Sequence, residues 1–117
     1  MSRHEVGVSL GQMLDHAREA RAMIRGRTRA DLDSDRMLNL ALVRLLEILG
    51  EAASRVQPED RANYPQIPWR EVVGLRNRLI HGYDRVDFDI LWEIVTEDLD
   101  PVIAELEKNV RREEPPS

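Results

Sequence analysis

The segment from Met37 to Val56 constrains the fold more than any other part of this chain. Its polar side chains recur at helical spacing and form one narrow stripe, made of Arg44, Glu47, Glu51 and Arg55, while most other positions are apolar. In a chain of 117 residues, one neighbouring helix cannot cover so much apolar surface. We therefore expect this helix to pack into the core on one side and against a second copy of the chain on the other. The alternative is a central helix that the chain's other helices wrap completely.

Helical patterns also fill the sequence before this segment. The first helix is expected to start at Ser9, which forms a capping-box pattern with Gln12, and to end at Gly26. The second helix, which contains the apolar segment, is expected to start from an Asp33 cap and to run to about Val56.

Two more helices are expected after a proline-rich loop at residues 57–68. The third spans Trp69 to about His81, and the fourth opens at Asp87. Pro101 removes a backbone donor from the fourth helix, so we expect a kink or a restart there. No stretch alternates apolar and polar residues with the period of a strand. The sequence therefore predicts an all-α, up-and-down bundle of four or five helices. It forms one domain over residues 1–117, with a core at about 8–110 and a disordered tail at 111–117.

Composition narrows the classes of function. The chain has no cysteine, which excludes disulfides and thiolate chemistry, and no apolar run of membrane-spanning length, so we expect a cytoplasmic protein with no membrane contact. The net charge of −5 argues against a non-specific duplex binder. Residues 61–85 nevertheless form a basic island of net charge +3, which leaves room for a local RNA or nucleotide site.

Only one segment of the island gathers groups that can do chemistry: Arg76, Asn77, Arg78, His81 and Tyr83. Histidine exchanges protons near neutral pH, and arginine binds phosphate. On one helix Asn77 and His81 would share a face, whereas Arg76 and His81 would point about 140° apart. Those two could meet through the length of the arginine, through relaxation at the helix end, or across a dimer cleft. The structural alternative is an ordinary helix end with a capping histidine and solvated arginines.

Three blocks of the sequence resemble successive blocks of the HepT-like family, a branch of the HEPN superfamily. The blocks are LALVRLLEILGEAASRV, YPQIPWREVVGLRNRLIHGYDRVD and LWEIVTEDLDPVIAEL, and the resemblance covers about residues 8–108. The family signature is Arg, four to six residues, His, any residue, Tyr. Arg76, His81 and Tyr83 fill it with the four-residue gap.

The resemblance implies a HEPN-like helical bundle that forms a symmetric homodimer, with two copies of the motif in one cleft. It implies a metal-independent endoribonuclease toxin of a type II/VII-like toxin–antitoxin pair, with RNA as substrate and no cofactor. The partner would be an MNT-type nucleotidyltransferase antitoxin, which neutralises the toxin by adenylylating Tyr83.

Within this hypothesis Arg76 and His81 are the catalytic residues: His81 is general base or acid, and Arg76 stabilises the charge of the transition state. Asn77, Arg78 and Tyr83 bind the substrate or nucleotide. The histidines have no metal-ligand spacing, so no metal site is expected. The alternative function is a non-catalytic dimer that binds a nucleotide or docks the nucleotidyltransferase through the same cleft. The sequence does not decide whether Arg70 and Arg85 belong to the site.

Overall fold

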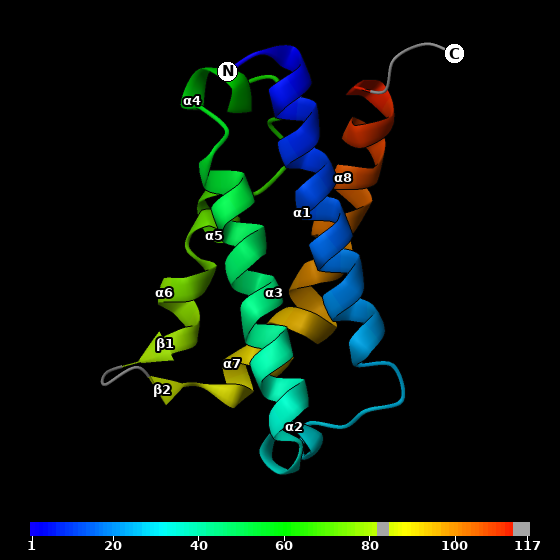
Figure 1. Cartoon of the computed structure of the whole chain (residues 1–117), viewed down its shortest axis with the longest axis vertical. Helices are drawn as coiled ribbons and strands as arrows, with labels where there is room; N and C mark the ends of the chain where they lie inside the picture. Colours follow the sequence, from blue (N-terminus) through cyan, green and yellow to red (C-terminus); the bar gives the residue numbers. More distant parts are fainter. Residues whose placement is uncertain (82–84, 114–117) are drawn as a thin grey trace.

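Two long antiparallel helices, α1 (Arg3–Met23) and α3 (Arg36–Ser54), form the centre of the fold (Figure 1). The computed structural model describes residues 1–81 and 85–113, with the side chains of 1–80 and 85–111. Helix α8 (Leu99–Glu113) packs along α1, and the short helices α5 (Trp69–Val73) and α6 (Leu75–Leu79) pack along α3. In Figure 1 the chain runs down along α1, up along α3, down along α5 and α6, and up along α8, and these four passes form the layers of the fold. This up-and-down order confirms the predicted all-α bundle.

Short elements connect the four layers. They are α2 (Asp31–Ser34), α4 (Pro58–Arg61), β1 (Ile80–His81), β2 (Arg85–Val86), α7 (Phe88–Glu93) and the π-helical turn η1 (Ile94–Asp98). The central contact between α1 and α3 is made by aliphatic side chains that are fully buried, among them Leu10, Met13, Leu42 and Leu46. None of the helices in the described ranges combines the length and the apolar character that crossing a bilayer needs.

Helix α1 begins six residues before the predicted Ser9, so that prediction is wrong. Ser2 is the N-cap: its side-chain oxygen accepts a hydrogen bond from the Glu5 amide at 3.1 Å, and its hydroxyl donates to the Glu5 carboxylate. Val6 is buried in the first turn, so the helix gains core contacts by starting early. Helix α1 ends at Met23, three residues before the predicted end at Gly26, and Gly26 lies in the left-handed region with φ 73° in the turn that follows.

Helix α3 is capped by Asp35 and not by the predicted Asp33. The Asp35 carboxylate accepts a hydrogen bond from the Leu38 amide at 3.0 Å. Asp33 belongs to the separate turn α2 and forms an ion pair with Arg29 at 3.1 Å. The buried Asn39 side chain joins the two elements, because its amide donates to the Leu32 carbonyl at 2.9 Å.

The fourth layer begins as predicted and then contains an irregularity. Asp87 is the N-cap of α7 and accepts hydrogen bonds from the amides of Asp89 and Ile90. The expected interruption near Pro101 takes the form of η1, after which α8 restarts at Leu99. Pro101 therefore sits in the first turn of α8, where helical amides have no partner one turn earlier in their own helix. Helix α8 continues to residue 113, into the range predicted as a disordered tail; residues 114–117 lie outside the described part.

Two helical glycines differ in the space around them, and this gives a first testable prediction. A β-carbon on Gly11 would meet nothing within 4 Å, whereas one on Gly50 would lie 3.1 Å from the Val72 carbonyl oxygen of α5. We expect Gly11→Ala to raise the free energy of unfolding by about 0.5–1 kcal/mol through helix propensity. Gly50→Ala should lower it by about 1 kcal/mol, because α5 must shift away from α3. Urea unfolding of both variants measures the difference; equal gains would contradict the close contact.

Candidate active site

The motif does not lie on one continuous helix, so the predicted helix from Trp69 to His81 is wrong in its second half. The segment breaks at Gly74 between α5 and α6, and helical geometry ends at Leu79. Ile80 is extended, with φ −100° and ψ 117°, and it begins β1. The helical angles that separated Arg76 from His81, and that paired Asn77 with His81, therefore do not apply.

Strand β1 pairs with β2 in an antiparallel ladder that carries the motif histidine. Ile80 lies opposite Val86, and His81 lies opposite Arg85. The ladder continues with a hydrogen bond of 2.9 Å from the Asp87 amide to the Leu79 carbonyl. For His81 the structure describes the backbone alone, and Tyr83 lies outside the described residues.

Three contacts order the loop before α5 and connect it to the end of α3. The Trp69 indole donates to the Tyr64 carbonyl at 3.1 Å, and the Arg61 guanidinium donates to the Val56 carbonyl at 2.8 Å. The same guanidinium carbon lies 5.6 Å from the centre of the Trp69 ring, within cation–π range. These contacts fix the start of the segment that leads to the motif.

The Arg76 side chain of α6 contacts α3 and is otherwise open to solvent. Its Nε is 3.4 Å from a carboxylate oxygen of Glu47, and its side chain is 64% exposed, against 25% for Glu47. An arginine held through Nε keeps its two terminal nitrogens for a phosphate. Arg76 and Asn77 also line a pocket of about 220 Å³ on α3, here called the motif pocket. Its remaining lining residues are Glu47, Gly50, Glu51, Ser54 and Val73.

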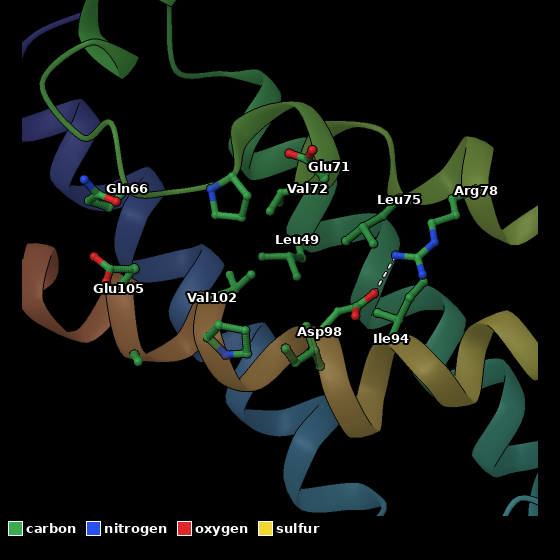
Figure 2. A pocket seen from close by; sticks show the side chains of 14 residues that line it. Leu49, Gln66, Glu71, Val72, Leu75, Arg78, Ile94, Asp98, Val102 and Glu105 are labelled. Atoms are coloured by element: carbon green, nitrogen blue, oxygen red, sulfur yellow. Dashed lines mark hydrogen bonds and ion pairs between the residues drawn. The ribbon is translucent and has the colours of Figure 1, made fainter.

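Arg78 lies on a different side of α6 from this pocket. Its guanidinium forms an ion pair with Asp98 of η1 at 2.5 Å (Figure 2) and a second one with Glu93 of α7 at 3.5 Å. It lines one end of a larger cavity of about 660 Å³ between α5 and α8, over apolar side chains such as Leu49 and Leu75. The structure thus brings Arg76 and Asn77 together and places Arg78 with acidic partners elsewhere.

Glu47 is a site residue that the sequence interpretation missed. It was assigned to the polar stripe of the apolar helix, together with Arg44, Glu51 and Arg55, and this pattern is typical of a solvated face. The position of Glu47 in the stripe does not reveal that Arg76, nearly thirty residues later in the sequence, contacts it. Among the residues whose side chains are described, no three His, Asp or Glu groups come together in a way that could hold a metal ion.

The ion pair with Glu47 predicts a moderate loss of activity when its charge is removed. Glu47→Gln should lower the rate of the RNA cleavage that the family resemblance implies by about two- to fivefold, since a largely exposed ion pair contributes about 0.2–1 kcal/mol. Single-turnover cleavage assays measure the effect. The matched control is Glu107→Gln on α8, because Glu107 pairs with Arg18 at 3.5 Å and does not line the motif pocket. Equal losses in the two variants would show that Glu47 acts only through the net charge of the chain.

Fold and motif together define an all-helical domain of the HEPN-like type. The family model described as "HepT-like: Ribonuclease HepT-like" matches residues 13–109. The chain belongs to this family, and its class of activity is that of a ribonuclease.

Relatives agree with the assignment over most of the chain. A protein of Methanocaldococcus jannaschii named "Putative RNase MJ1380" is 36% identical over 107 residues, which cover 92% of this chain and 98% of that protein. A protein of Thermococcus cleftensis named "Probable ribonuclease HepT" is 38% identical over 67% of this chain and 71% of its own length. No solved structure gives a significant match to the chain.

Proposed function

We propose that the chain is a metal-independent endoribonuclease and that Arg76, Asn77 and His81 form the site at which it cleaves RNA. In this mechanism His81 accepts the proton of a ribose 2′-hydroxyl, and the 2′-oxygen attacks the adjacent phosphorus. The bond to the 5′-oxygen breaks, that oxygen takes up a proton from water, and a 2′,3′-cyclic phosphate remains. Arg76 stabilises the extra negative charge that the phosphate carries in the transition state.

The placement of Arg76 is the observation that supports this proposal most directly. Its guanidinium is oriented by Glu47 and is still largely exposed beside the motif pocket. A guanidinium that a carboxylate holds on one side and that is open on the other can accept a phosphate from solvent. Asn77 lines the same pocket and can donate to a phosphate or a base.

We further propose that two chains form a homodimer through α3, with both motifs in one cleft. Met37 and Leu40 of α3 are 83% and 52% exposed and are neighbours on the helix, so they form a small exposed apolar surface. Leu40 lies about two turns before Glu47, the partner of Arg76. The helical-angle argument for a dimer no longer holds, so the proposal depends on this exposed apolar surface.

The toxin role and its neutralisation are proposed from the family alone. A nucleotidyltransferase antitoxin would transfer AMP from ATP to the Tyr83 hydroxyl, with pyrophosphate as the leaving group. The added phosphate would carry negative charge two residues from His81 and would compete with RNA for Arg76. Mass spectrometry of the chain co-expressed with such an enzyme tests this step, and an unmodified Tyr83 would contradict it.

RNA cleavage in the presence of a chelator tests the central proposal. The purified chain is incubated with single-stranded RNA and EDTA, and products are resolved on a denaturing gel. The expected result is cleavage that leaves cyclic phosphate ends. Binding of RNA or nucleotide without cleavage would favour the non-catalytic module instead.

A further inference from the structure

A second pocket on α3, of about 320 Å³, contains two arginines that the proposed mechanism does not use. Arg36 comes from the start of α3 and Arg85 from β2, and Val43, Val86 and Phe88 provide an apolar wall. Arginine next to an apolar or aromatic surface is a combination that binds the phosphate and the base of a nucleotide. We infer that this arginine pocket binds a phosphate and its nucleotide in the RNA strand, a few nucleotides from the scissile bond. The inference rests on the proposed ribonuclease function.

The two pockets lie along one stripe of α3. The arginine pocket uses residues 36, 39, 40 and 43, and the motif pocket uses residues 47, 50, 51 and 54. These positions continue one another at intervals of three and four, which is the spacing of a single helix face. Val43 and Gly50 are two turns apart, or about 10 Å at ~1.5 Å per residue. One RNA strand that follows the stripe can therefore reach both pockets. Met37 lies about 100° around the helix from Arg36, so the proposed homodimer contact lies on the flank of this stripe, and Leu40 borders both surfaces.

The hairpin that carries the motif histidine also carries one of these arginines. Arg85 is the ladder partner of His81, so its backbone lies directly across from the proposed catalytic residue. Partners in an antiparallel ladder are about 4.5–5.5 Å apart. A phosphate bound at Arg85 would thus lie within a few nucleotides of the scissile bond.

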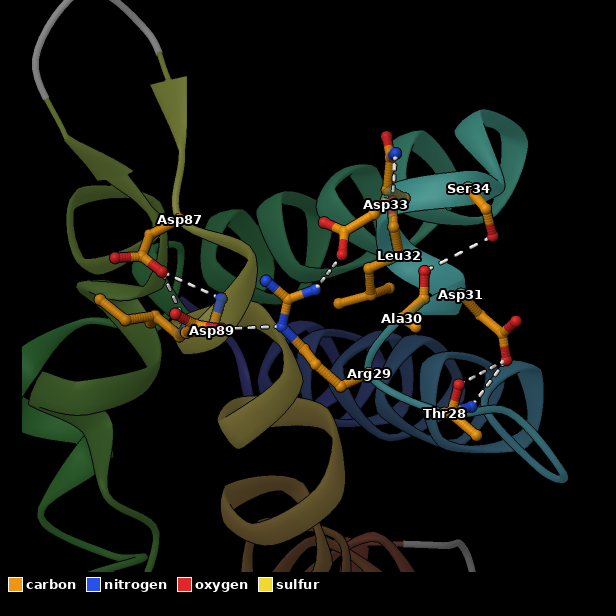
Figure 3. A network of polar contacts seen from close by, with 11 residues as sticks. Thr28, Arg29, Ala30, Asp31, Leu32, Asp33, Ser34, Asp87 and Asp89 are labelled. Atoms are coloured by element: carbon orange, nitrogen blue, oxygen red, sulfur yellow. Dashed lines mark hydrogen bonds and ion pairs between the residues drawn. The ribbon is translucent and has the colours of Figure 1, made fainter.

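Acidic side chains around the arginine pocket already have other partners. Arg29 forms ion pairs with Asp33 and Asp89, and its hydrogen bond to Asp89 raises the pKa of Arg29 above its ordinary value (Figure 3). Asp87 accepts the amides at the start of α7.

Asp35 caps α3 and forms an ion pair with Arg27 at 3.2 Å. Across the described residues, Arg36 and Arg85 have no ion pair, so their charge is available to a ligand. This contrasts with Arg78, which two carboxylates hold.

The salt dependence of RNA binding tests the inference. The probe is a fluorescein-labelled single strand of 2′-O-methyl RNA, which lacks the attacking hydroxyl and stays intact during the titration. Each phosphate contact contributes about −0.7 to the slope of log affinity against log salt for a single strand. Arg36→Gln and Arg85→Gln should each reduce the slope by about this amount. At low salt the double variant should bind the probe up to about tenfold more weakly than the wild-type protein does.

Arg111→Gln is the matched control, because Arg111 is exposed at the opposite end of the bundle from the start of α3. It should leave the slope unchanged. If wild-type protein cleaves unmodified RNA while both pocket variants keep the wild-type slope, the pocket is not a subsite and the proposed function stands. If wild-type protein binds the probe without cleaving RNA, the proposed function fails, and the slopes still decide the pocket. If wild-type protein binds no RNA, both fail.

Discussion

Replacement of His81 by alanine is expected to reduce RNA cleavage by about 10²- to 10⁴-fold, the usual contribution of general acid–base catalysis. The same variant should relieve any growth inhibition that the wild-type chain causes. Single-turnover cleavage and growth after induction measure the two effects. His4→Ala is the control, since His4 is an exposed residue of the first helical turn. Full activity of the His81 variant would remove the histidine from the mechanism.

Replacement of Arg76 by alanine is expected to lower the cleavage rate by about 10²- to 10³-fold, because a preorganised positive group at the phosphate is lost. Arg76→Lys should recover only part of this loss, since lysine keeps the charge without the planar fork. Arg18→Ala serves as control: Arg18 lies on α1 and pairs with Glu107 of α8 at 3.5 Å. A small effect at Arg76, equal to that at Arg18, would contradict its assigned role.

These two variants also test whether one site draws residues from two chains. If Arg76 of one chain works with His81 of the other, a mixed dimer of the two inactive variants contains one complete site. Random mixing should then restore about a quarter of wild-type activity, because half of the dimers are mixed and each has one working site of two. No recovery on mixing would place Arg76 and His81 of each site in the same chain.

The sequence predicted the number and order of the main helices, because their apolar faces repeat over many residues. It also located local signals such as Asp87 and Gly26, each of which acts through its own neighbours. The predicted start of α1 was misplaced because Ser9 and Gln12 also form a capping-box pattern, although Ser2 and Glu5 form the actual cap. Choosing between two plausible caps requires knowing that Val6 is buried, which is a tertiary fact.

The motif itself was identified, but its geometry was not. Periodicity extended the third helix to His81, whereas Ile80 leaves the helix to pair with Val86 across the hairpin. Arg76 and Arg78 were assigned to one site, as catalytic and as substrate-binding residue, yet α6 turns them to different partners, Glu47 and Asp98. Such pairings join residues that are distant in sequence, and no local pattern records them. Whether Arg76, Asn77, Arg78, His81 and Tyr83 act as assigned stays a prediction.

The hydrogen bond between Leu79 and Asp87 closes the hairpin at its base, independently of the residues at its tip. Both of its flanks are fixed, since Leu79 is buried and Asp87 caps α7. The entropy of closing such a loop rises slowly with length, by only about 0.6 kcal/mol for each doubling. An insertion after Tyr83, which keeps the His-x-Tyr spacing, should therefore cost the bundle little stability. Related chains can then change the segment that follows the motif, and with it their substrate preference, while the helices keep their packing.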